Sequence, residues 1–234
     1  VILCLIGGFT LDSKQFWEKF ANKRIAVCGI GISNMPVIKN FLEKGARVFV
    51  CDKRTREQLG PVCDELEKQG AELILGEHYL DNLEVDVIFR TPGMSFNLPQ
   101  LKEARKRGIA VTSEMEVFFD LCPAKIFAVT GSDGKTTTTT LIAKMLEEEG
   151  NTVHVGGNIG HPLLPEIDSI KPTDYVVVEL SSFQLISMRK SPDVAIVTNV
   201  TPNHLDIHKD MDEYVEAKKN ILLHQGAFSR TVLN

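Results

Sequence analysis

The sequence has no block of basic residues and no apolar run long enough to cross a membrane. Its 26 lysines and arginines are scattered among 31 acidic residues, and the formal net charge is −5. Because a nucleic-acid surface needs clustered basic side chains, the sequence predicts no DNA or RNA partner. The apolar opening, residues 1–9, is far shorter than the roughly 20 residues of a membrane-spanning helix, and no basic region precedes it. We therefore expect no membrane partner, and a strand or an edge of the core at this position.

Cysteine is sparse, and the five cysteines are odd in number. No two of them are close enough along the chain to suggest a zinc knuckle or a redox pair. We expect reduced, buried thiols in a cytoplasmic protein. The positions are Cys4, Cys28, Cys51, Cys63 and Cys122.

The apolar content is sufficient for one large globular domain or two modest ones, since 43% of the residues are hydrophobic and 24% are charged. The chain starts with Val1 rather than methionine, and residues 232–234 have the pattern of a strand about to enter a turn. We therefore expect a fragment whose catalytic unit continues beyond it.

Short β-branched runs alternate with helical patterns along the whole chain, which is typical of βαβ units and of α/β folds with parallel sheets. Pro123 separates a helical stretch, 113–121, from a new strand, 125–130. We therefore predict a Rossmann-like domain over residues 1–123 and an incomplete P-loop-type ATP-binding domain over residues 124–234. The expected strands are 24–28, 47–51, 72–75, 85–89, 109–112, 125–130, 152–155, 175–180 and 194–199, and one more begins at residue 230. The expected helices are 36–44, 58–70, 98–108, 113–121, 135–150 and 211–223.

A glycine-containing loop after the strand at 125–130 is the most informative stretch of the sequence. Gly131 and Gly134 let backbone N–H groups turn toward a phosphate, and the next two residues, Lys135 and Thr136, begin a helix. A lysine there neutralises phosphate oxygens, and a threonine hydroxyl can reach Mg²⁺. Fewer residues separate the glycines than in a Walker A loop, so this is a shortened variant; the alternative is an ordinary glycine-rich turn. The predicted ATP-binding residues are Gly131, Ser132, Asp133, Gly134, Lys135, Thr136 and Thr137, with the amides around Ser132 and Asp133 and the amine of Lys135 forming the phosphate cradle.

Polar side chains also follow two other buried strands of the second half. Glu179 ends the apolar run 175–178, where a carboxylate needs a cation partner; the alternative is a cap on the next helix through Ser181 and Ser182. His204 follows the strand at 194–199, and a lone histidine is more often structural than a ligand. Lys218, beside Lys219 on an amphipathic helix, would ordinarily belong to a solvated face.

The first half has a second strand-end loop, with Gly29 and Gly31 between a strand and a helix. Asp52 ends the next strand about 20 residues later, as in a dinucleotide-binding fingerprint. Asn34 replaces the third glycine of that pattern, which weakens the indication of NAD binding. For Asp52 and Arg54 the alternative to a binding role is a surface ion pair.

Together these motifs resemble those of the Mur ligases and their relatives, which include folylpolyglutamate synthases. The Thr-Gly-x-x-Gly-Lys-Thr-Thr loop is similar to the ATP loop of that family, and residues 156–160, 179–185 and 199–206 follow as its further motifs in the expected order. The resemblance covers nearly the whole chain. The family has three domains, so it implies that the C-terminal domain is absent here.

The resemblance implies specific roles for residues of the second half. It assigns Thr136 and Glu179 to the Mg²⁺ that accompanies ATP, and His204 to a second Mg²⁺ site. It also implies that Lys218, rather than Lys219, is carbamylated and becomes a metal ligand. Lys135, His204 and Lys218 would then be the catalytic residues, whereas Asp206 and His208 would be loop or solvent residues.

The same resemblance implies a UDP-sugar site in the first half. Gly31, Ile32 and Ser33 would lie near the diphosphate, and Asp52 and Arg54 near the uridine. The strand-end loop 91–93 would complete that pocket through Gly93. The residues expected near the muramoyl-alanine end are Asn158, Ser181, Gln184 and His204.

The implied reaction belongs to peptidoglycan synthesis in the cytoplasm. ATP and two Mg²⁺ ions would activate the alanyl carboxylate of UDP-N-acetylmuramoyl-L-alanine as an acyl phosphate, which the amine of D-glutamate then attacks. Without the C-terminal domain, we expect binding but no turnover. Two alternatives stay open: another ligase of the family that uses a different amino acid or a folate, and a NAD-dependent oxidoreductase or nucleotide-binding regulatory module. The second leaves the loop at residues 131–137 unexplained.

Overall fold

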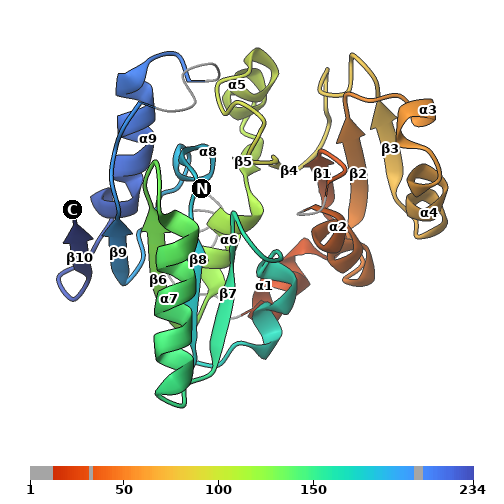
Figure 1. Ribbon diagram of the computed structural model, residues 1–234. Coiled ribbons are helices and arrows are strands. Elements are labelled where there is room, and N and C mark those ends of the chain that lie inside the picture. Colours follow the sequence, from red (N-terminus) through yellow and green to blue (C-terminus); the bar gives the residue numbers. More distant parts are fainter. Residues whose placement is uncertain (1–12, 32–33, 203–207) are drawn as a thin grey trace. The chain divides into compact units, whose positions relative to one another are not determined.

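The computed structural model describes residues 13–31, 34–202 and 208–234 (Figure 1). The chain forms two compact units, Val1–Glu114 and Met115–Asn234, each built on its own five-stranded parallel sheet. The predicted α/β fold class is therefore confirmed. The opening run, residues 1–9, lies outside the described residues. Within the described ranges, none of the helices combines the length and apolar character that a membrane span requires.

The sheet of the first unit has the order β3-β2-β1-β4-β5. The chain adds β2 and β3 on one side of β1, and then β4 and β5 on the other side. The loops after β1 and β4 therefore lie next to each other at the carboxyl edge of the sheet. Open α/β sheets bind their ligands at such a reversal point. The strands are β1 (Arg24–Cys28), β2 (Arg47–Asp52), β3 (Glu72–Leu75), β4 (Val87–Phe89) and β5 (Ala110–Thr112).

An aromatic cluster joins the helices of the first unit to its sheet. Phe16, Phe20, Phe41 and Phe89 pack with neighbouring ring centroids 4.4–6.5 Å apart, and all four are buried. This cluster fixes α1, a helix that the sequence analysis did not predict, and α2. The helices are α1 (Ser13–Phe20), α2 (Asn34–Glu43), α3 (Arg56–Leu59), α4 (Val62–Lys68) and α5 (Pro99–Lys106).

The single helix predicted over residues 58–70 is wrong, because α3 and α4 are separate helices. Gly60 has a φ of 66°, and Pro61 has no N–H to continue the first helix. Gln58, expected inside one long helix, instead closes a capping box with Thr55 at the start of α3.

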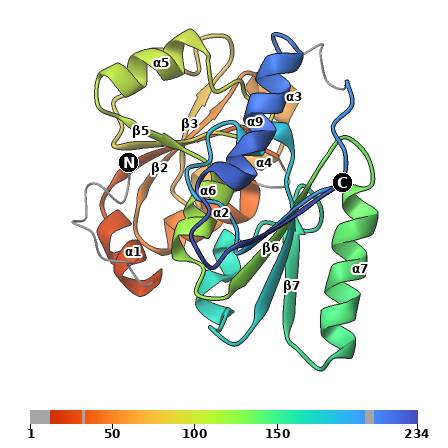
Figure 2. The same ribbon diagram turned by 90° about the vertical axis from the view of Figure 1, so that its left-hand side faces the viewer.

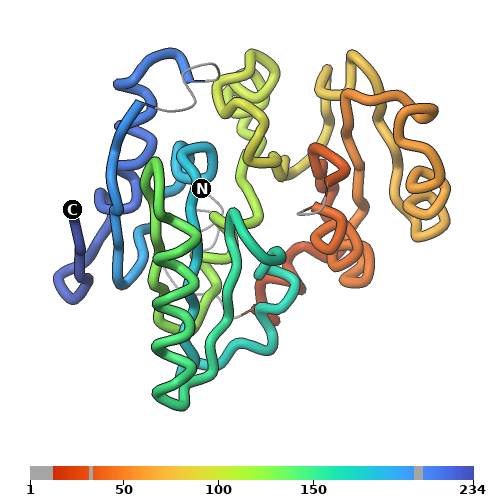
Figure 3. The backbone as a smooth tube through the Cα atoms, viewed as in Figure 1, coloured from red at the N-terminus to blue at the C-terminus, as the bar shows by residue number. Residues whose placement is uncertain are grey.

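The sheet of the second unit has the order β10-β9-β6-β8-β7, so β6 is central and β8 and β9 flank it. Its inner strands are near-continuous apolar runs, as expected when helices cover both faces of a parallel sheet. Figure 2 shows α7 alongside β6 and β7, and the backbone path of Figure 3 leads from β6 directly into α7. The strands are β6 (Lys125–Thr130), β7 (Val153–Gly157), β8 (Tyr175–Glu179), β9 (Val194–Val197) and β10 (Arg230–Leu233). The helices are α6 (Glu114–Leu121), α7 (Lys135–Glu148), the 3-10 helix η2 (Leu164–Ser169), α8 (Ser182–Leu185) and α9 (Met211–Leu223).

Helix α6 belongs with the second unit. Ser187 Oγ donates to Glu116 Oε2 at 2.9 Å, and Lys190 Nζ donates to the carbonyl oxygen of Phe119 at 2.6 Å. The compact units therefore divide at the first residue of α6, between Glu114 and Met115, ahead of the boundary predicted at Pro123.

Candidate functional site

The loop between β6 and α7 depends on its two glycines. Gly131 has a φ of 153°, and a Cβ at this position would overlap the Oγ1 atom of Thr198. Gly134 has a φ of 77° and forms the N-terminal cap of α7 in a left-handed conformation. The predicted sequence of strand, glycine loop and helix is therefore present, and no larger residue fits the first glycine position.

The start of α7 has the geometry of an anion site. The first amides of a helix, here those of Lys135, Thr136 and Thr137, have no carbonyl acceptor within the helix, and the helix dipole is positive at this end. The ammonium of Lys135 lies against the same loop and donates to the carbonyl oxygens of Gly131 at 3.0 Å and Ser132 at 2.9 Å. Phosphate oxygens are suitable ligands for this combination of amides and ammonium.

The amides of Ser132 and Asp133, which were predicted to form the phosphate cradle, already have acceptors within the protein. Both donate to the side-chain oxygen of Asn199, at 3.1 Å and 2.9 Å respectively. The amide of Ser132 also donates to the backbone carbonyl of Asn199 at 3.0 Å. In this arrangement the donors that can meet a phosphate are the first amides of α7 and Lys135, rather than the amides of Ser132 and Asp133.

Glu179 lies at the carboxyl end of β8 with only 2% of its surface exposed. Thr136 Oγ1 donates to its Oε2 atom at 2.6 Å, and Asn158 Nδ2 donates to its Oε1 atom at 2.8 Å. The structure thus brings Thr136 and Glu179 together, as the predicted metal site requires. A carboxylate and a hydroxyl are hard oxygen donors of the kind that Mg²⁺ prefers, so these residues fit the ion. Asn158, which we expected only near the substrate, is the partner that sequence reasoning missed.

Ser181 and Gln184 are engaged with each other at the start of α8. Ser181 Oγ accepts from the backbone amide of Gln184 at 3.3 Å, and Gln184 Oε1 accepts from the Ser181 amide at 3.0 Å. This reciprocal pair is a capping box, so the alternative in which Glu179 caps this helix does not apply. Contact of either residue with a substrate stays a prediction.

Lys218 is buried against the phosphate loop. Its Nζ atom donates to the carbonyl oxygen of Gly131 at 2.9 Å and to Thr130 Oγ1 at 3.3 Å, and it lies 4.6 Å from the ring centroid of Tyr214. Burial, reinforced by the nearby charge of Lys135, lowers the pKa of Lys218 to about 8. Lys219, by contrast, is exposed and pairs with Glu216. The geometry therefore favours Lys218 over Lys219 as the residue of the site.

His208 lies in the loop before α9, as expected, but it is buried rather than exposed to solvent. Its Nε2 atom lies 2.9 Å from Ser182 Oγ, and its Nδ1 atom lies 3.3 Å from Glu213 Oε2. The ring stacks on Phe183 at a centroid distance of 4.8 Å. These contacts tie α8 to the start of α9, an arrangement that sequence spacing alone did not indicate. His204 and Asp206 lie outside the described residues.

In the first unit, Asp52 ties the end of β2 to the loop after β1. Its carboxylate accepts from the amide of Ile30 at 2.7 Å and from Nη2 of Arg54 at 2.7 Å, and Asp52 is 4% exposed. Burial alone would raise the pKa of Asp52, but the hydrogen bonds from Arg54 and Ile30 outweigh it and lower the pKa below its usual value. The predicted alternative, an ion pair, is therefore present, and its acidic member is buried.

Asn34, which replaces the third glycine of the dinucleotide fingerprint, binds the loop after β1. Its buried Nδ2 donates to the carbonyl oxygens of Cys28 at 2.8 Å and Gly29 at 3.0 Å. Gly31 begins the turn into α2, since its carbonyl accepts from the amide of Met35. Gly93 lies in the turn after β4 that the hydrogen bond from the Met94 amide to the carbonyl of Thr91 closes. Ile32 and Ser33 lie outside the described residues.

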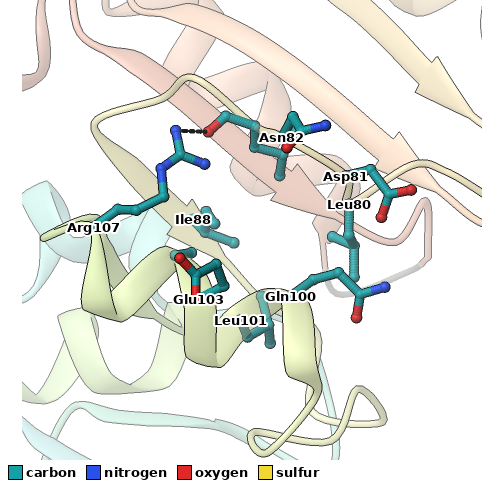
Figure 4. Close-up of a pocket in the computed structure, with 10 residues that line it drawn as sticks. Leu80, Asp81, Asn82, Ile88, Gln100, Leu101, Glu103 and Arg107 are labelled. Carbon is teal, nitrogen blue, oxygen red and sulfur yellow. Dashed lines mark hydrogen bonds between the residues drawn. The ribbon is translucent and has the colours of Figure 1, made fainter.

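Two further features of the first unit involve residues to which no binding role was predicted. Cys28 and Cys51 are register partners on β1 and β2, and their side-chain hydrogen bond, together with burial, raises the pKa of Cys28. A hollow between α5 and the segment before β4 is lined by residues that include Asn82, Glu103 and Arg107 (Figure 4). None of the residues lining this hollow was predicted as a site residue.

Comparison with known proteins identifies both units. Residues 23–113 match the "Mur ligase MurD-like, N-terminal domain" family, and residues 129–234 match the "Mur ligase middle domain" family. The UDP-N-acetylmuramoylalanine–D-glutamate ligase of Acetivibrio thermocellus is 56% identical over 94% of this chain and 47% of its own length. The enzyme of the same name from Clostridium botulinum is 53% identical over 94% of this chain and 48% of its own length. The chain thus spans about half the length of these relatives.

A solved structure supports the fold. The UDP-N-acetylmuramate:L-alanyl-gamma-D-glutamyl-meso-diaminopimelate ligase from Neisseria meningitides aligns with 92% of this chain and 72% of its own, with a TM-score of 0.56 and 20% sequence identity. At that identity the likeness concerns the fold alone. The two family matches and the identity to the ligases of A. thermocellus and C. botulinum lead to one conclusion: the chain belongs to the Mur ligase family and comprises its N-terminal and middle domains.

Proposed function

We propose that this chain is the substrate-binding and ATP-binding part of a ligase that adds D-glutamate to UDP-N-acetylmuramoyl-L-alanine in cytoplasmic peptidoglycan synthesis. The names of the relatives that are 53–56% identical to it support this substrate pair. The observation that carries the proposal is the gathering of Lys135, Thr136 and Glu179 around one end of α7, at the carboxyl ends of β6 and β8.

In the proposed reaction, an oxygen of the alanyl carboxylate attacks the γ-phosphorus of ATP, and ADP leaves. The D-glutamate amine then attacks the carbonyl carbon of the acyl phosphate, loses a proton, and expels inorganic phosphate as the amide bond forms. The ammonium of Lys135 would offset the charge on the transferring phosphoryl group, and the first amides of α7 would orient the phosphates. Catalysis is thus mainly positioning and electrostatics, with no side-chain nucleophile.

Thr136 and Glu179 would hold the Mg²⁺ that accompanies ATP, and His204 with Lys218 would serve a second Mg²⁺. When bound, the ions supply charge neutralisation for phosphoryl transfer. The test compares Glu179→Gln with Glu166→Gln, which changes a carboxylate on η2 that is 44% exposed. We expect the first variant to lose the Mg²⁺ dependence of ATP binding and the second to retain it. Equal Mg²⁺ dependence in both variants would remove Glu179 from the metal site.

The environment of Lys218 supports its carbamylation. A lysine with a pKa of about 8 is partly neutral at physiological pH, and the neutral amine can add to CO₂, releasing a proton and leaving an anionic carbamate. With ¹³C-labelled bicarbonate, we expect a carbamate NMR signal that Lys218→Arg abolishes and Lys219→Arg leaves unchanged. A signal that persists in Lys218→Arg would contradict the proposal.

The UDP-sugar would bind in the first unit, with Gly31, Ile32 and Ser33 near the diphosphate and Asp52 and Arg54 near the uridine. Gly93 would complete that side. The residues proposed for the muramoyl-alanine end are Asn158, Ser181, Gln184 and His204.

The decisive assay measures amino-acid-dependent phosphate release by the full-length gene product with ATP and UDP-N-acetylmuramoyl-L-alanine. We expect release with D-glutamate, and release with a different amino acid instead would indicate another ligase of the family. The 234-residue chain should bind the UDP-sugar, and ATP more weakly, without turnover. Binding of NAD but not ATP would instead favour an oxidoreductase or a regulatory module.

A further inference from the structure

The segment directly after β9 holds the phosphate loop of the second unit. We propose that Asn199 is a positioning residue that fixes the loop and thereby selects which backbone amides meet the nucleotide. This inference rests on the proposed ATP site and goes beyond it, because it assigns a role to a residue outside the loop itself.

One side chain satisfies three polar groups of the loop. Asn199 Oδ1 accepts from the amides of Ser132 at 3.1 Å and Asp133 at 2.9 Å, and Asn199 Nδ2 donates to the carbonyl oxygen of Asp133 at 3.1 Å. A carboxamide presents an acceptor oxygen and a donor nitrogen side by side on one short side chain. An aspartate would keep the acceptor and lose the donor.

Neighbours of Asn199 hold the same turn from both sides. Thr198 Oγ1 donates to the carbonyl oxygen of Asp133 at 2.6 Å. The amide of Thr201 donates to Ser132 Oγ at 2.9 Å, and Ser132 Oγ donates to the carbonyl of Thr201 at 2.8 Å. Because β6 and β9 pair in parallel up to Thr130 and Val197, these contacts extend the ladder into the loop.

This arrangement has a consequence for phosphate binding. An amide that donates to Asn199 is not available to a ligand, so the phosphates are left with Lys135 and the first amides of α7. The loop is also ordered before the nucleotide arrives, which lowers the entropic cost of binding. Asn199 is uncharged, whereas a carboxylate at this position would repel the phosphates.

The experiment uses the 234-residue chain, a non-hydrolysable ATP analogue with Mg²⁺, and amide NMR with hydrogen exchange. For the natural sequence, we expect the analogue to shift the amide signals of Lys135, Thr136 and Thr137 and to leave the amides of Ser132 and Asp133 protected. Transfer of those two amides to the analogue, seen as new shifts with altered protection, would overturn the proposal.

Two variants and a control sharpen the test. In Asn199→Ala, the amide of Asp133 should exchange faster, whereas that of Ser132 keeps the backbone carbonyl of residue 199 as an acceptor. Affinity for the analogue should fall roughly tenfold because the loop must be ordered on binding. Asn199→Asp should keep the amides protected and still bind the analogue more weakly. The control, Asn151→Ala, removes a comparable carboxamide at the other end of α7, where it donates to Leu146, and should change neither quantity.

The possible failures are distinguishable. If the natural chain does not bind the analogue, the proposed ATP site fails, while exchange without ligand still tests whether Asn199 protects the loop amides. If the natural chain binds and a folded Asn199→Ala variant binds equally well, the positioning role is excluded. Should Asn199→Ala not fold, Asn199→Asp carries the test, and unchanged affinity in that variant would exclude the role.

Discussion

Each unit of this chain has a loop after its central parallel strand. An asparagine side chain holds each loop, but it binds different backbone groups in the two units. In the first unit, Asn34 lies on the helix after the loop and donates to the carbonyls of Cys28 and Gly29. In the second unit, Asn199 follows the neighbouring strand β9, accepts from two loop amides and donates to the carbonyl of Asp133. Similar topology therefore leads to different sets of occupied backbone groups, carbonyls alone in the first unit and two amides with one carbonyl in the second.

The buried carboxylates at the ends of β2 and β8 also have different kinds of partner. Asp52 pairs with the guanidinium of Arg54, which compensates its charge within the unit. Glu179 meets a hydroxyl from Thr136 and an amide from Asn158, which are hydrogen-bond donors without charge. The first arrangement suits a preformed polar pocket, and the second suits a site completed by a cation. The comparison shows that the two sheets place a carboxylate at the same kind of edge, whereas the neighbouring side chains decide whether its charge is compensated.

The largest effect should come from adding one methyl group at Gly131, and the same change at Gly31 provides the comparison. A Cβ at residue 131 would overlap Thr198, so Gly131→Ala should lower the free energy of unfolding of the second unit by roughly 3 kcal/mol and abolish ATP binding. A Cβ at residue 31 meets nothing within 4 Å, so Gly31→Ala should change stability by less than about 0.5 kcal/mol. Urea unfolding followed by circular dichroism measures both, and equal losses would break the contrast.

An intermediate effect is expected from Asp52→Asn in the first unit. Removing the charge weakens the hydrogen bonds from Arg54 and Ile30, and we expect a loss of about 2 kcal/mol at pH 7. Because the folded pKa of Asp52 lies below the unfolded value, its ionised form stabilises the fold above about pH 4, and this contribution is lost as the pH falls through the folded pKa. The difference between variant and natural chain should therefore shrink in acid. Fluorescence of Trp17, the single tryptophan, follows unfolding of this unit; a difference that is constant with pH would contradict the ionic role.

The smallest effect is expected from Tyr214→Phe in the second unit. The buried hydroxyl of Tyr214 lies 2.9 Å from Ser132 Oγ, so its removal should cost about 1 kcal/mol and weaken ATP binding slightly. Tyr175→Phe, at the start of β8, is the matched control and should leave ATP binding unchanged. Unchanged ATP binding in Tyr214→Phe would exclude a contribution of this hydroxyl to the geometry of the loop.

Much of the fold could be predicted, because buried parallel strands are apolar runs with clear ends. The predicted limits of β1, β3 and α9 coincide with the observed ones. The failures have local causes: Gly60 and Pro61 interrupt a helical pattern, and α1 is a short helix fixed by its aromatic packing in the core.

The site was predictable only in part. The motif around Lys135 indicated the loop, and Glu179 was expected to need a partner, but neither spacing nor composition could identify Asn158 or Asn199 as partners. Their roles arise from strand order, which places residues far apart in the sequence at one edge of the sheet. The burial of His208 was missed for the same reason, since its partners come from α8 and α9.

The cysteines provide a final consequence. Cys28, Cys51 and Cys63 are buried in the first unit, whereas Cys122, which follows α6 in the second, is half-buried, and burial raises its pKa to about 11. Alkylating reagents attack exposed thiolates, so these thiols react when the surrounding unit opens. With Cys4 replaced by serine, timed labelling and mass spectrometry would give the labelling rates of the thiols in each unit separately. The chain's own cysteines can therefore report local unfolding of the two units in one experiment.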